Sequence, residues 1–139
     1  MRELEFRGKS CDKWVYGHLL KTEKDEVCCV NCEIKHSNYL IQTDELDQYN
    51  EYNQYYITDD DTIGQYTGLE DKNGVKIFEG DILKVHYIGS TENNEVIYDR
   101  GAFCVEYSED YHPLLNEINH CCEVIGNVWD NPELLKESE

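Results

Sequence analysis

The sequence predicts a mainly β protein: a small, partly open barrel or sandwich of about seven or eight short antiparallel strands, with one or two short helices near the C-terminus. Short stretches of alternating apolar and polar residues recur along the chain, and turn-forming Gly, Asn and Asp residues separate them. Little of the chain has helical spacing. An SH3-like barrel is the first choice, because Phe78–Val85 is similar to the turn and strand of such barrels.

The N-terminal stretch predicts a β-hairpin. Leu4 and Phe6 alternate with charged residues, Gly8–Lys13 has the composition of a turn, and Trp14–Leu20 predicts the second strand. A charged loop follows.

The next region is rich in polar and tyrosine residues. Thr43–Asp61 contains few aliphatic side chains, which is typical of an exposed connection or a sparsely packed strand. Asp59–Asp61 predicts a turn at its end.

The central stretch Gln65–Val85 predicts three strands and two turns. In Asp71–Gly74, Asn and Gly stand where a hairpin needs positive φ, which favours a type I turn followed by a glycine bulge. Tyr66–Leu69 should then pair with Val75–Phe78, and Glu79–Asp81 should reverse the chain again. The residues that we assign to this structural motif are Gly68, Asn73, Gly74, Gly80 and Asp81.

A second hairpin is expected after a loop at Gly89–Asn94. Its strands are Glu95–Tyr98 and Ala102–Tyr107, joined by a turn at Asp99–Gly101, and a polar loop at Ser108–His112 follows.

The C-terminal region combines short helices with one more strand. Pro113–Ile118 predicts one or two helical turns. Glu123–Trp129 predicts a strand in which Gly126 marks a bulge or a close backbone approach. Asn131–Leu135 predicts a short closing helix, with Asn131 as the N-cap and proline in the first position.

Length and charge exclude several classes of function. The 139 residues suffice for one domain, residues 1–139, without metal or disulfide. The 30 acidic and 12 basic side chains give a formal net charge of -18. We therefore expect neither direct nucleic-acid binding nor membrane binding, because both surfaces are polyanionic. A cationic partner is favoured instead.

The N-terminus is charged and lacks the apolar core of a signal peptide, and no apolar run approaches the roughly 20 residues of a membrane-spanning helix. We expect a cytosolic protein with reduced thiols. The odd number of cysteines, 7, also argues against a complete disulfide framework.

Four blocks of sequence carry a family likeness: Met1–Arg7, Thr62–Gly74 running on through Phe78–Ile82, Glu123–Leu135 and, less strongly, Gly101–Val105. In these blocks the chain resembles the YopX family of phage and prophage proteins. The resemblance implies a mainly β protein, encoded in phage or prophage regions and cytoplasmic in the bacterial host. It implies no biochemical activity and no catalytic or binding residue. A segment at about residues 21–61, acidic and rich in cysteine and tyrosine, departs from the family pattern.

A zinc site is the main candidate for bound metal. Cys29 and Cys32 can coordinate one zinc ion from a single turn, and His36 follows four residues further on. The second pair of ligands would come from Cys121 and Cys122. Adjacent cysteines are not the usual spacing of zinc ligands. Free thiols that pack as small hydrophobes are therefore the simpler interpretation. We expect no other cofactor. The Cys-X-X-Cys spacing also occurs in thioredoxin-like redox motifs, but no α/β pattern surrounds it here.

Carboxylates near the central motif are a second candidate for a cation site. Asp59–Asp61, Glu79 and Asp81 could together hold a divalent ion. Capping of backbone donors in turns explains the same residues more simply.

Two classes of function are open. A non-enzymatic phage accessory or interaction protein, with protein partners from the host or the phage, is favoured because the distinctive residues belong to turns and core. The charge, with the tyrosines between Tyr49 and Tyr56, also suggests an inhibitor that mimics DNA. A small enzyme or a zinc-binding protein with an unrecognised site is the alternative. Exposed strand edges favour self-association, so a homo-oligomer is also open.

Overall fold

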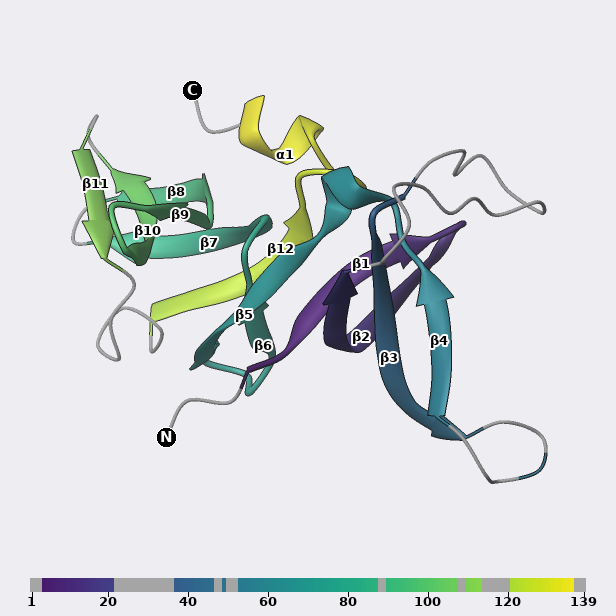
Figure 1. Cartoon of the computed structure of the whole chain (residues 1–139). Helices are drawn as coiled ribbons and strands as arrows, with labels where there is room; N and C mark the ends of the chain where they lie inside the picture. The colour runs from purple at the N-terminus through teal and green to yellow at the C-terminus, as the bar shows by residue number, and fades with distance from the viewer. Residues whose placement is uncertain are drawn as a thin grey trace. The chain divides into compact units, whose positions relative to one another are not determined.

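A computed structural model describes residues 4–21, 37–46, 49, 53–87, 90–107, 110–113 and 121–136, and they form antiparallel β-strands with one short α-helix near the C-terminus (Figure 1). The mainly β prediction is confirmed. Among the described strands the sheets are open, so the SH3-like barrel is not confirmed. Contacts divide the chain into two compact units, Met1–Gln65 and Tyr66–Glu139. Folding as a single domain stays a prediction.

The first unit contains a meander of four strands, in the order β4-β3-β2-β1, followed by the start of β5. The strands are β1 (Phe6–Ser10), β2 (Lys13–Lys21), β3 (Tyr39–Leu46), β4 (Asn53–Ile57) and β5 (Gly64–Glu70), which continues into the second unit.

The predicted N-terminal hairpin is confirmed, but its turn is shorter than expected. Ser10 pairs directly with Lys13, so only two residues make the turn, of which Cys11 has a φ of 57°. Gly8 is a strand residue, not a turn residue. A Cβ atom there would lie 3.1 Å from Cγ2 of Thr58, so glycine serves close packing.

The tyrosine-rich stretch contributes two paired strands to this unit. β3 pairs with β4, and Ile41 of β3 is fully buried. The predicted turn at Asp59–Asp61 is a short 3-10 helix, η1 (Asp60–Thr62), with Asp59 as its N-cap.

The second unit contains two three-stranded sheets, in the orders β12-β7-β8 and β11-β10-β9, and the central hairpin β5-β6. Its further elements are β6 (Lys76–Phe78), β7 (Asp81–Tyr87), β8 (Ser90–Glu95), β9 (Ile97–Asp99), β10 (Ala102–Tyr107), β11 (Asp110–Pro113), β12 (Cys122–Asn127) and α1 (Glu133–Lys136). One apolar core fills it, made of Ile77, Leu83, Val85, Val96, Phe103, Val105 and Cys122.

The central hairpin turn has the geometry that the sequence predicts. The N–H of Gly74 donates to the carbonyl of Asp71 at 3.0 Å, and the N–H of Asp71 donates to the carbonyl of Val75 at 2.8 Å. Gly74 has a φ of 81°, whereas Asn73 is not among the residues with positive φ. This is a type I turn with a glycine bulge, in which only the glycine takes the left-handed conformation.

The carboxylate of Asp71 ties this turn to β12. Its Oδ1 accepts the N–H groups of Asn73 at 2.8 Å and Val75 at 2.9 Å, and its Oδ2 accepts the N–H of Val124 at 2.9 Å. The side chain is buried, so these bonds are shielded from water. The turn and β12 are thereby held together across 53 residues of sequence.

The Glu79–Asp81 turn is confirmed, and it packs against Trp129. Gly80 has a φ of 91°, and a Cβ atom there would lie 2.3 Å from Cη2 of Trp129. Asp81 Oδ2 accepts the N–H of Phe78 at 2.7 Å. Glycine is therefore required at residue 80 both for its backbone conformation and for the close approach of the indole ring.

Two predicted loops are strands in the structure. Ser90–Glu95 pairs with β7 residue by residue, from Tyr87 opposite Ser90 to Ile82 opposite Glu95, and Asp110–Pro113 pairs with β10. Backbone groups form these ladders, so polar side chains do not prevent them. Pro113 ends a strand and does not begin a helix; Leu114–Ile118, the rest of that predicted helix, lies outside the described residues.

The C-terminal predictions are confirmed with one change. β12 has an irregular register between Val124 and Gly126, and a Cβ atom on Gly126 would lie 2.5 Å from Oδ1 of Asn131. α1 follows Pro132, as expected. The Asn131 side chain, however, accepts the N–H of Asn127 at 3.3 Å, so it supports the preceding turn.

We expect Gly80→Ala to lower the free energy of unfolding by roughly 2–4 kcal/mol, because an added methyl group combines backbone strain with overpacking. Gly101→Ala is the matched control. Gly101 has a φ of 86° but nothing within 4 Å of its Cβ position, so only the backbone cost of roughly 1 kcal/mol applies. Urea denaturation of both variants measures the difference. Equal losses would show that the contact with Trp129 is unimportant.

We expect Asp71→Asn to lower the free energy of unfolding by about 1–3 kcal/mol, because an amide donor facing the part-buried N–H of Val124 leaves it without an acceptor. Glu70→Gln, at the exposed neighbouring position, is the control and should change stability by less than about 0.5 kcal/mol. Urea denaturation gives both values, and a neutral Asp71→Asn variant would contradict the role of the carboxylate.

Candidate functional site

The aspartates before β5 serve as capping groups. Asp59 Oδ1 accepts the N–H of Asp61 at 3.1 Å. The carboxylate of Asp60 accepts the Ser37 hydroxyl at 3.0 Å and the backbone N–H of Asn38 at 3.1 Å. These bonds join η1 to the start of β3, so the carboxylates have structural partners.

The two acidic residues of the next turn also separate in role. Asp81 is fully buried, and its carboxylate accepts the N–H of Phe78. Glu79 is half-buried and lies beside Glu95. Burial raises the pKa of Glu95, and the Glu79 carboxylate raises it further. Among the described residues, no group of three His, Cys, Asp or Glu side chains could hold a metal ion.

Of the zinc candidates, only two lie within the described residues. Cys121 and Cys122 are free thiols, and Cys122 is fully buried in the apolar core of the second unit. Cys29, Cys32 and His36 lie outside the described residues, so zinc binding stays a prediction.

The remaining described cysteines differ in state. Cys104 is a buried free thiol, and burial followed by the charge of Asp99 raises its pKa. Cys11 is disulfide-bonded, so the expectation of reduced thiols throughout is wrong at this residue.

Exposed acidic and aromatic side chains gather on the last two strands of the first unit. We define the β3–β4 surface as the part of these two strands that carries Asp44, Glu45 and Leu46 of β3 with Tyr55 and Tyr56 of β4. Tyr55 and Tyr56 are neighbours in a strand, so their side chains project from opposite faces of the sheet. All except Tyr56 are exposed, and Tyr55 is 53% and Leu46 49% accessible. Such a mixture of aromatic, aliphatic and acidic groups is typical of protein interfaces, where aromatic side chains are enriched.

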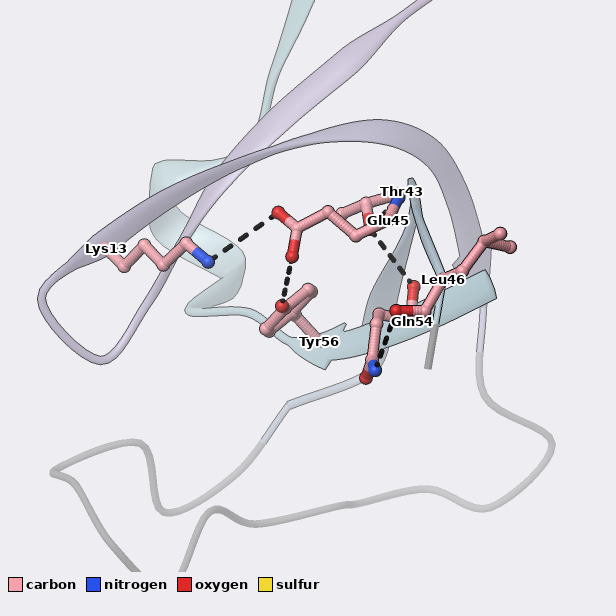
Figure 2. A network of polar contacts seen from close by, with 6 residues as sticks. All are labelled: Lys13, Thr43, Glu45, Leu46, Gln54 and Tyr56. Carbon is pink, nitrogen blue, oxygen red and sulfur yellow. Dashed lines mark hydrogen bonds and ion pairs between the residues drawn. The ribbon is translucent and has the colours of Figure 1, made fainter. Parts of the chain in front are cut away.

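A polar network orders one end of this surface (Figure 2). Glu45 accepts the Tyr56 hydroxyl at 3.0 Å and lies 3.7 Å from Nζ of Lys13, which stands 4.9 Å from the centre of the Tyr56 ring. The Gln54 amide donates to the carbonyl of Leu46 at 3.5 Å. Lys13 and Glu45 are more than half exposed, so their pair contributes little to stability.

Tyr55 projects from the face opposite Tyr56 and is accessible there. Its hydroxyl accepts a hydrogen bond of 3.3 Å from the Gln42 amide, which orients the ring without covering it. Asp44 is exposed as well. Cationic side chains of a partner could pair with the Asp44 carboxylate and stack on the Tyr55 ring, because aromatic faces attract Lys and Arg.

Sequence reasoning found the acids and tyrosines but missed Lys13 and the carboxylate of Asp71. Asp at the first position of a type I turn is a recognisable signal, so the contacts of Asp71 with Asn73 and Val75 were within reach. The approach of Lys13 to Glu45 depends on the register of β2 on β3, for which the sequence has no local signal.

Comparisons with known proteins agree with this fold. The model of a family described as YopX protein matches residues 5–136. Protein EF1440 from Enterococcus faecalis is 26% identical with a TM-score of 0.56, and the match covers 97% of this chain and 99% of that chain. Protein yopX from Bacillus subtilis is 20% identical with a TM-score of 0.58, covering 94% and 97%. No curated protein matches significantly. No helix in the described residues could span a membrane.

We expect the Cys122 thiol to resist alkylation in the folded protein, whereas Cys121 reacts. Burial raises the pKa of Cys122 from an ordinary value of 9.0 to about 12, with further contributions from Cys121 and Asp71, and the thiolate is the reactive form. Iodoacetamide labelling at pH 8, followed by peptide mass spectrometry, measures both sites. Unfolding in urea is the control, and Cys122 should then react. Rapid labelling of Cys122 in the folded chain would contradict its burial.

The same shift has a consequence for stability. The folded state holds the thiol proton of Cys122 more tightly than the unfolded state does. The resulting contribution to the free energy of unfolding is fully present below about pH 9 and is lost as pH rises toward 12.

Proposed function

The chain belongs to the YopX family, and from this premise we propose that it is a non-enzymatic protein-interaction module, encoded by a phage or prophage and acting in the cytoplasm of the bacterial host. The observation that carries the proposal is the β3–β4 surface, where Tyr55 and Asp44 are accessible to a partner. The partner is a basic protein of the host or the phage.

The roles of the signature residues support a non-enzymatic function. Asp71 binds three backbone N–H groups, Asp81 binds one, and Gly80 accommodates Trp129. Each of these residues is explained by the architecture of the second unit. A reacting centre needs a nucleophile or base within hydrogen-bond reach of its partners, and these side chains are occupied by backbone groups instead.

Net charge supports a basic partner. At -18, the chain attracts cations over a distance of about 8 Å at physiological salt and accelerates encounter with a basic surface. The exposed carboxylates of Asp44 and Glu45 concentrate negative charge on β3, which pairs with the strand that carries Tyr55. Binding should therefore weaken as salt increases.

A narrower second candidate follows from the same charge. A protein with 30 carboxylates can occupy the basic cleft of a DNA-binding protein in place of DNA. The two candidates differ in one observable. DNA displaces the chain from its partner only if the chain acts as a DNA mimic.

The test is affinity purification from the infected host, comparing the wild-type chain with the double variant Asp44→Lys, Tyr55→Ser. We expect the variant to lose the basic partner, because it reverses a charge and removes an aromatic contact on the β3–β4 surface. Mass spectrometry identifies the partner, and titration of the purified pair with DNA separates the two candidates.

The matched control is Glu70→Lys, Tyr98→Ser in the second unit. It changes the charge equally and removes a tyrosine of similar exposure, 55% against 53%. This control should keep the partner. If both variants bind as the wild type does, or both lose binding equally, the β3–β4 surface is not the interface.

A further inference from the structure

The outer edge of β4 is an open backbone edge in the described part of the chain. β4 is the first strand of its sheet, with β3 on one side and no described strand on the other (Figure 1). Edge strands expose unpaired N–H and C=O groups, and proteins usually protect them with Lys, Pro or a covering element. Asn53–Ile57 contains no charged residue and no proline.

The other described edges are shorter or are contacted by neighbouring elements. β12, which is longer, is contacted by the central turn, since the N–H of Val124 donates to Asp71 at 2.9 Å. β6, at the opposite end of the same strand order, has only three residues. β8 is contacted by α1, since the Asn93 amide donates to the carbonyl of Leu134 at 3.0 Å. β4 therefore offers a longer backbone edge than β6.

One face of the sheet continues to this edge in cross-strand rows. Leu20, Leu40 and Ile57 are register partners in one row, and His18, Gln42 and Tyr55 form the next. All six are exposed or half-buried. A strand added beside β4 would extend both rows, so β-branched side chains beside Ile57 and Tyr55 would gain cross-strand contacts.

Acidic residues lie at both ends of the edge. Leu46 pairs with Asn53, which brings Asp44 and Glu45 near the start of β4, and Asp59–Asp61 follow its end. A second copy of this chain would bring its own carboxylates against these, and each copy carries a charge of -18. Charge complementarity instead favours a segment that is basic at its ends.

We propose that β4 binds its partner by strand addition: an extended segment, basic at both ends and β-branched in the middle, pairs with the outer edge of β4. This inference rests on the proposed function and names the kind of partner segment that the β3–β4 surface receives. Main-chain hydrogen bonds supply affinity in this mode, and alternate side chains supply specificity.

The probe is a blocked peptide, Lys-Arg-Thr-Val-Thr-Val-Thr-Arg-Lys, titrated against the full chain by calorimetry. Three analogues carry N-methyl groups on the amides of one edge, of the other edge, or of both. They keep the charge but remove backbone donors. For strand addition, methylation of both edges lowers affinity at least tenfold, while one of the two single-edge analogues stays within threefold of the parent.

Two results would overturn the inference. If the fully methylated peptide binds as tightly as the parent, charge alone is responsible; if the parent does not bind at all, the edge is not a peptide site. Loss of the cellular partner in Asp44→Lys, Tyr55→Ser would in either case leave the proposed function standing. Sedimentation of the chain alone should give a monomer, and a dimer that the peptide dissociates would assign the edge to a second copy.

Discussion

The second unit depends on one buried carboxylate. Asp71 accepts two N–H groups of its own hairpin turn and one from β12, and the N–H of the next residue, Lys72, donates to the carbonyl of Cys122 at 3.2 Å. Charge-assisted bonds to a buried carboxylate are strong, and removing this acceptor leaves three part-buried donors without their partner. The turn, β12 and the apolar core around Cys122 are therefore positioned together.

A second link joins the same two parts of the sequence. The Trp129 ring occupies the space that a side chain at Gly80 would need, and the N–H of Val128 donates to the carbonyl of Gly80 at 3.0 Å. The central and C-terminal blocks that carry the family likeness are thus the blocks that meet in space. The described contacts of these residues serve the architecture of the second unit.

The first unit uses its side chains differently. Lys13, Glu45 and Tyr56 form an exposed network that contributes little stability, and Tyr55 is accessible on the opposite face of β4. Interactions of this kind can be exchanged for contacts with a partner at small cost. The edge of β4, beside which no described strand lies, adds backbone groups to the same surface, so side chains and main chain can act together in recognition.

The sequence by itself determined the features that depend on neighbouring residues. Gly74 after Asn73 specifies its hairpin turn, Pro132 precedes the closing helix, and the excess of carboxylates sets the charge. Alternation of apolar residues was enough to identify the mainly β class. Local steric and hydrogen-bond preferences act over a few residues, so a single sequence reveals them.

Only the tertiary structure decided the features that depend on register and long-range pairing. Ser90–Glu95 is a strand because β7 lies beside it, and Lys13 meets Glu45 across β2 and β3. The bond from Val124 to Asp71 spans 53 residues. Such contacts form where distant backbones pair, and a shift of one residue in register would move each of these side chains to the opposite face.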